Sequence, residues 1–261
     1  MLIWLVLIPL IAAALIGLCK APARPTALLS ASLTLALGIW ALVSFDGCSS
    51  CWSRFEGMDL QLTLAPALSK VMLLLTILVT FATVLGTNPP QGGEASWYNS
   101  ALLISAGATG AFLSDNIISF FAFHELALIP TFVMIGLYGR GDRRTTAWRA
   151  TLYLGLASMV LLAALLMIGT QAGFTFSGLK DFMASGRELA HAELIGALLI
   201  AGFGTLISLF PFHSWAAPAY ASAPAPVAMM HAGVLKKFGL YGLFMFQPLM
   251  ETGFLPWTNI L

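Results

Sequence analysis

The chain has 261 residues, of which 59% are hydrophobic and only 9% are charged, and its formal net charge is +1. A water-soluble domain carries roughly 25% charged residues, and a nucleic-acid-binding domain needs a basic surface, so the composition argues against both classes. Many of the apolar runs are long enough to cross a bilayer. The sequence therefore predicts an all-α polytopic membrane protein.

Apolar stretches separated by charged or Pro/Gly-rich breaks predict about eight transmembrane helices. No break is long enough for a soluble domain, so residues 1–261 form one membrane domain. The first stretch lacks a basic segment before it and a small-residue cleavage site after it, which favours a retained span over a signal peptide. The predicted spans cover residues 2–19, 27–45, 66–87, 97–113, 116–138, 149–170, 193–215 and 226–247.

Basic residues fall unevenly on alternate loops. The first, third, fifth and seventh loops hold Lys20, Arg24, Arg140, Arg143, Arg144 and Arg149. The opposite loops hold Arg54, Lys70, Lys180 and Arg187. The side richer in basic residues is expected to be cytoplasmic, which places the N-terminus outside a bacterial inner membrane or its organellar equivalent.

The second loop contains the sequence CSSC, and its two thiols then face outward. In an oxidising compartment Cys48 and Cys51 are candidates for a disulfide, and the alternative is two free loop thiols. Three cysteines in the whole chain are too few for a disulfide framework.

Lys70 and Arg149 lie at helix ends and can reach the headgroups. Away from the helix ends, three charged residues remain inside the predicted spans: Glu125, Lys236 and Lys237. An ionisable group at mid-membrane costs at least ~2.5 kcal/mol, so it indicates a functional site by default. The alternative for Glu125 is a neutral, hydrogen-bonded packing residue. Adjacent helical residues point about 100° apart, so one lysine is expected to face the interior while the other reaches the headgroups or lines a second cavity.

The seventh predicted span contains Pro211, which should break the helix because proline lacks the backbone donor and clashes with the preceding turn. Broken helices in membranes line wet cavities or ion sites. His213 follows the break and His231 opens the next span, so both are candidate proton relays, although a satisfied hydrogen-bonding role is an equal alternative. The histidine spacing indicates no metal site. Together these features suggest a path for protons or monovalent cations.

Two segments resemble the antiporter-like membrane subunits of respiratory complex I. The first is LSDNIISFFAFHELALIPTFVMIGLYG, with an acid after a run of aromatic residues and a proline after it. The second is PFHSWAAPAYASAPAPVAMMHAGVLKKFGLYGL, with a PFH-x-W core, an A-P-x-P-V loop and a lysine before G-x-Y-G. The chain is most similar to the chain M type, called chain 4 in mitochondria, which is related to Mrp cation/proton antiporter subunits.

The resemblance implies roles for individual residues. Glu125 falls on the fifth-helix glutamate of the family, which tunes a central lysine, and Lys237 falls on the eighth-helix lysine of the hydrophilic axis. The family places a further lysine in the broken seventh helix, where this chain has Leu206. That departure leaves Glu125 without its usual partner.

The resemblance also implies a longer protein. Family members have about fourteen helices with two inverted five-helix repeats, of which this chain covers three N-terminal helices (1–87) and the first repeat (97–247). We expect another chain, or the remainder of a longer one, to complete any path.

The favoured function is a proton-translocating membrane-arm subunit of an NADH:quinone oxidoreductase, embedded in lipid among other membrane-arm subunits. The chain itself would hold no cofactor; NADH, flavin, iron–sulfur clusters and quinone would belong to partner subunits. The alternatives are an Mrp-type cation/proton antiporter subunit and a non-pumping structural subunit.

Overall fold

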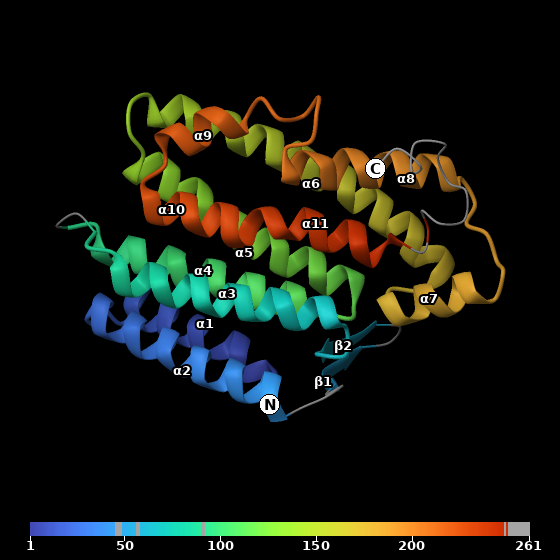
Figure 1. Cartoon of the computed structure of the whole chain (residues 1–261), viewed down its shortest axis with the longest axis horizontal. Helices are drawn as coiled ribbons and strands as arrows, with labels where there is room; N and C mark the ends of the chain where they lie inside the picture. Colours follow the sequence, from blue (N-terminus) through green and yellow to red (C-terminus); the bar gives the residue numbers. More distant parts are fainter. Residues whose placement is uncertain (45–48, 56–57, 90–91, 248, 250–261) are drawn as a thin grey trace.

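The computed structural model describes residues 1–44, 49–55, 58–89, 92–247 and 249. Long helices lie side by side, with a β-hairpin and one short helix at one end of the bundle (Figure 1). The elements are α1 (Ile3–Gly17), α2 (Ala23–Ser44), β1 (Ser49–Phe55), β2 (Met58–Thr63), α3 (Ala67–Gly86), α4 (Glu94–Leu113), α5 (Ile117–Tyr138), α6 (Arg143–Ala172), α7 (Phe176–Ala184), α8 (Ala192–Ile207), α9 (Ala216–Ser222), α10 (Ala225–Met230), a π-helical turn η1 (His231–Leu235) and α11 (Lys236–Met245).

The chain is a membrane-type helical protein, as its composition predicts. Among the described residues, α2, α3, α5 and α6 are long and apolar enough to cross a membrane. Helices α1 and α8 are apolar but shorter, with 15 and 16 residues. The bounds of α1 follow its predicted span closely, whereas α8 ends at Ile207, well before the predicted end of the seventh span at residue 215.

Polar side chains fix where two of the long helices begin. The Asn116 side chain accepts hydrogen bonds from the backbone N–H groups of Ile118 and Ser119, which caps α5. Asp142 caps α6 by accepting from the N–H of Thr145. Because of that cap, α6 begins at Arg143 rather than near residue 149, and the polar RRTTAWR segment forms its first turns.

The second loop corrects the all-α prediction, because it folds into an antiparallel hairpin of β1 and β2. The segment MDLQLT alternates apolar and polar residues with the period of a strand, and this signal is too short to stand out beside long helical runs. Cys48 lies outside the described residues, so the predicted disulfide with Cys51 remains a prediction.

The eighth predicted span is not one regular helix. A π-helical turn, His231–Leu235, separates α10 from α11. Such turns occur mostly as single insertions in α-helices, frequently at functional sites. The loop predicted before the seventh span also holds a helix, α7. The Thr175 side chain caps its N-terminus by accepting a hydrogen bond from the N–H of Gly178.

Aromatic residues and hydroxyls join α3, α4 and α11 in the core. The rings of Phe112 and Phe238 stack with centroids 4.9 Å apart. The Tyr241 hydroxyl lies 3.0 Å from the Ser69 hydroxyl and donates to the backbone oxygen of Phe112 at 3.2 Å. These bonds satisfy buried polar groups that have no access to water.

Helices α4 and α5 approach closely at Gly107. A Cβ at this position would lie 2.6 Å from the backbone oxygen of Phe123 and 2.8 Å from the backbone nitrogen of Ala127. We expect Gly107→Leu to lower the free energy of unfolding by about 1–3 kcal/mol or more, because backbone atoms cannot yield as a side chain can. Gly155→Leu is the matched control, since nothing lies within 4 Å of a Cβ there. Thermal unfolding of the two purified variants checks the difference, and equal losses would contradict it.

Candidate functional site

Glu125 lies in the middle of α5 beside a buried histidine. The His124 side chain is 1% exposed and that of Glu125 is 32% exposed, and Nδ1 of His124 lies 3.2 Å from Oε1 of Glu125. The two groups are poorly aligned, so neither atom has a hydrogen-bond partner among the described residues. Glu125 therefore has a buried oxygen available for another contact.

A cavity of about 210 Å³ opens beside Glu125, between α5, α6 and η1. Its polar lining comes from Glu125, Thr131, Thr151 and His231. The remaining walls are apolar and consist of Leu128, Ile129, Phe132, Ile135, Ala150, Leu154 and Gly155. The structure thus brings Glu125 and His231, predicted as separate candidates, to one cavity.

His231 is buried and held by α9. Its Nδ1 lies 3.2 Å from the Tyr220 hydroxyl, and its ring packs against those of Trp215 and Tyr220. Its Nε2 is buried with no hydrogen-bond partner among the described residues. The Tyr220 hydroxyl donates to Nδ1 when Nε2 carries the proton, and accepts from it in the other tautomer.

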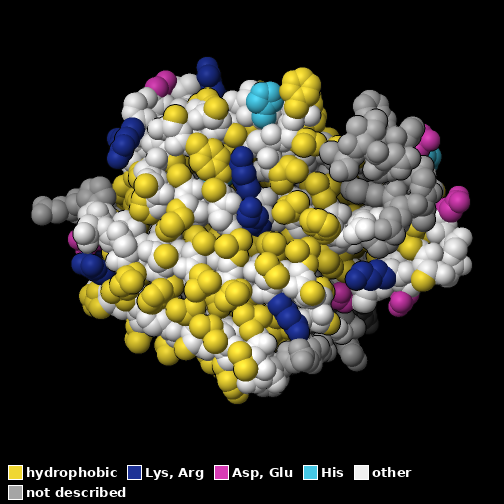
Figure 2. All heavy atoms as spheres, in the orientation of Figure 1, with side chains coloured by type: hydrophobic (Ala, Val, Ile, Leu, Met, Phe, Trp, Pro, Cys, Tyr) yellow, Lys and Arg dark blue, Asp and Glu magenta, His cyan; other side chains and the backbone are white. Residues whose placement is uncertain are grey.

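Lys236 also faces this aromatic group. Its ammonium lies 4.9 Å from the ring centre of Tyr220 and 5.9 Å from that of Trp215, within the range of a cation–π interaction. Lys237 is half-buried on the next face of α11 and forms no ion pair with another described residue. Figure 2 shows basic side chains in the middle of a largely hydrophobic surface over α10 and α11.

The helix break begins before Pro211. Helix α8 ends at Ile207, the residue whose carbonyl a proline four positions later would obstruct. Ser208 adopts a positive φ of 61°, and α9 starts at Ala216. His213 is exposed within this interruption and does not line the cavity at Glu125.

Leu206 lies one residue before the end of α8 and packs into the core. It is 4% exposed, and a Cβ on Gly239 of α11 would lie 3.1 Å from the Leu206 Cβ. Leu206 does not line the cavity that holds Glu125 and His231. In this chain the position serves contact between α8 and α11.

Sequence reasoning missed Tyr220 and the two threonines of the cavity. Tyr220 lies in the proline-rich segment that predicts only a loop, and the threonines look like ordinary helix residues whose hydroxyls donate to carbonyls one turn earlier. No cluster of three or more potential metal ligands occurs in the part of the chain that the structure describes.

The Tyr220–His231 contact yields a stability test. We expect Tyr220→Phe to lower the free energy of unfolding by about 1 kcal/mol or more, because it leaves the buried Nδ1 of His231 unpaired. Tyr153→Phe is the control, since its hydroxyl only accepts from the exposed Ser214. Thermal unfolding measures both, and a loss no larger for Tyr220→Phe than for the control would contradict the role assigned to the buried contact.

The comparisons with known proteins agree on one family. The profile described as "NADH:quinone oxidoreductase/Mrp antiporter, TM" matches residues 114–261. A curated relative from Microcystis aeruginosa, "NAD(P)H-quinone oxidoreductase chain 4 2", is 33% identical over 199 residues. That match covers 74% of this chain and 34% of the relative, so the matched part spans about a third of the relative's length.

Solved structures share the fold. Respiratory complex I from Thermus thermophilus with bound NADH contains a chain that matches with a TM-score of 0.86 and 26% identity, covering 100% of this chain and 56% of that one. The Mrp complex from Dietzia sp. matches with a TM-score of 0.79 and 22% identity, covering 94% of this chain and 47% of that one. The second likeness shows the fold alone.

Proposed function

Since the chain belongs to the NADH:quinone oxidoreductase/Mrp antiporter family, we propose that it contributes a proton-translocating half-channel to the membrane arm of a complex I-type NADH:quinone oxidoreductase. One observation carries the proposal: Glu125 and His231 line the same cavity. Apart from the 3.2 Å contact of Glu125 with His124, Oε1 of Glu125 and Nε2 of His231 are buried with no hydrogen-bond partner among the described residues. Buried ionisable groups that face a cavity inside a membrane mark ion and proton pathways.

The cavity has the dimensions and the chemistry of a proton relay. A volume of about 210 Å³ has room for several water molecules, and the threonine oxygens on α5 and α6 supply further acceptors. A proton on Glu125 would pass through such water to Nε2 of His231. Tyr220 is hydrogen-bonded to Nδ1 and so fixes the orientation of the His231 imidazole. The ammonium of Lys236 lies over the ring of the same tyrosine.

The other candidates take supporting places. Lys237, on the next face of α11, would carry the proton onward along the membrane axis. His213 is exposed at the interruption between α8 and α9 and would exchange protons with the surroundings. Further segments would complete the path.

The proposed arrangement in the membrane has eight crossings. Six would be α1 to α6, and the other two would be α8 together with α9 and α10 together with α11. The end of the bundle that carries Lys20, Arg140 and Arg143 would face the cytoplasm, and the N-terminus would lie outside. NADH, flavin, iron–sulfur clusters and quinone would belong to partner subunits.

Two other functions are separated by one experiment. The family description, which includes Mrp antiporters, leaves a cation/proton antiporter as one alternative, and the apolar Leu206 favours a structural subunit without transport. The native complex in sealed proteoliposomes is driven with NADH and a quinone while proton uptake is recorded, with and without Na⁺. Redox-driven uptake that persists without Na⁺ and collapses with a protonophore supports the proposal. Transport of protons only against a Na⁺ gradient would support the antiporter, and electron transfer without any uptake would overturn pumping by the complex.

A further inference from the structure

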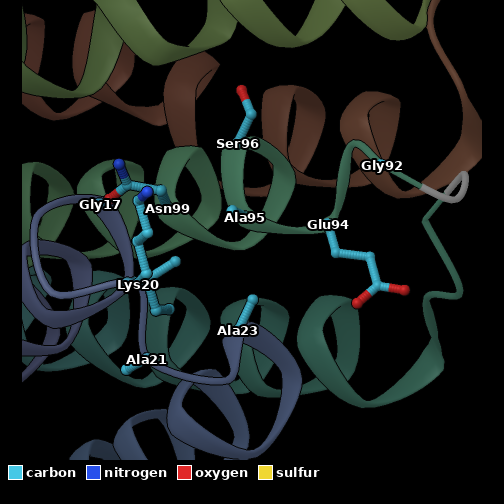
Figure 3. Close-up of a pocket in the computed structure, with 10 residues that line it drawn as sticks. Gly17, Lys20, Ala21, Ala23, Gly92, Glu94, Ala95, Ser96 and Asn99 are labelled. Carbon is cyan, nitrogen blue, oxygen red and sulfur yellow. The ribbon is translucent and has the colours of Figure 1, made fainter.

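A second cavity, which shares no lining residue with the cavity at Glu125, lies at the end of the bundle where α1 meets α2 and where α4 begins. Its volume is about 550 Å³, and its wall includes Gly17, Lys20, Glu94, Ser96 and Asn99 (Figure 3). Because it lies at the ends of apolar helices, it is at the level of the lipid headgroups in a bilayer.

The cleft carries two opposite charges that do not neutralise each other. Figure 3 shows Lys20 extending toward Asn99 and Glu94 pointing the other way. Neither Lys20 nor Glu94 forms an ion pair with any residue that the structure describes. One end of the cleft is therefore positive and the other negative.

One further group at the positive end suits an anion. The Asn99 amide nitrogen faces Gly17, where a Cβ would lie only 3.2 Å away. Its Oδ1, buried without a hydrogen-bond partner among the described residues, is an acceptor, so only the amide nitrogen of Asn99 can bind a phosphate. The start of α4, at Gly93 and Glu94, belongs to the negative end of the cleft.

We propose that this cleft binds the headgroup of a zwitterionic phospholipid with a primary amine, of the phosphatidylethanolamine type. The phosphate would accept hydrogen bonds from the Lys20 ammonium and the Asn99 amide nitrogen, and the lipid ammonium would donate to Glu94. A trimethylammonium headgroup has no N–H to donate to a carboxylate, and a glycerol headgroup offers no cation. The cleft thus distinguishes headgroups that share a phosphate.

The test uses a probe inside the cleft. Photoreactive p-benzoylphenylalanine replaces Ala95, which lines the cleft between Asn99 and Glu94 (Figure 3). The native complex with this probe is placed in nanodiscs of equal parts phosphatidylethanolamine, phosphatidylcholine and phosphatidylglycerol. Mass spectrometry identifies what is crosslinked after illumination. We expect phosphatidylethanolamine to exceed phosphatidylcholine by about tenfold, the effect of one charge-assisted hydrogen bond.

Two substitutions separate the ends of the site. Glu94→Gln should bring the ratio of phosphatidylethanolamine to phosphatidylcholine close to one, and Lys20→Gln should reduce crosslinking to all three lipids. Glu193→Gln and Lys180→Gln are matched controls on exposed positions outside the cleft, and should change neither quantity.

Three results would overturn the proposal: equal crosslinking of the amine and choline lipids, a preference for phosphatidylglycerol, or crosslinks to a partner protein instead of lipid. If a charge variant fails to assemble, the ratio of the amine lipid to the choline lipid in the complex that carries only the probe still tests the proposal. The site goes beyond the proposed function, and its failure would leave proton translocation unaffected.

Discussion

Replacing Glu125 by glutamine is expected to lower the number of protons translocated per electron, with a fall of about tenfold or more in the flux through this half-channel. Glutamine keeps nearly the same shape but cannot hold and release a proton at this position. Electron transfer should persist, because this chain holds no redox centre in the proposed function. Proton uptake and NADH oxidation, measured together in proteoliposomes, give the ratio.

Two further variants make the Glu125 result specific. Glu125→Asp keeps the carboxyl group and should restore part of the proton flux. Glu193→Gln removes an exposed carboxyl from the first turn of α8 and should leave the ratio unchanged. An unchanged ratio in Glu125→Gln would mean that Glu125 is a packing residue and that this half-channel is closed.

The helices were largely predictable because their apolar runs are long. Helix α5 begins one residue from its predicted start, where the Asn116 side chain caps it. The β-hairpin was not predictable from the same reasoning, because six alternating residues carry a weak signal and the helical runs on both sides dominate.

Sequence reasoning selected Glu125 and His231 as candidates, but not their common cavity or the threonines that line it. A glutamate and a histidine in apolar runs stand out because burying them is costly. That they line one cavity depends on how α6 packs beside α5 and on the π-helical turn that begins at His231. Neither feature has a local sequence signal, and the Tyr220 contact depends on the path of the chain between α8 and α10.

The position of Leu206 bears on whether a lysine at this place could pair with Glu125 or whether the residue only packs α8 against α11. If a lysine at 206 could reach Glu125, the substitution Leu206→Lys would create a buried ion pair. The structure instead packs Leu206 against Gly239 on α11 and leaves it outside the Glu125 cavity. We expect Leu206→Lys to lower the free energy of unfolding by about 3 kcal/mol or more, because it buries a charge without a partner.

A double-mutant cycle tests this expectation. With no contact between the two side chains, the effects of Leu206→Lys and Glu125→Gln on unfolding should add to within about 0.5 kcal/mol. Leu206→Met is the matched control, since it keeps the volume and apolar character and should cost less than about 1.5 kcal/mol. A favourable coupling above about 1 kcal/mol, joined to a higher proton-to-electron ratio in Leu206→Lys, would instead show that the lysine reaches Glu125. In that case position 206 would be the centre of the proton path, and the cavity at His231 would only assist it.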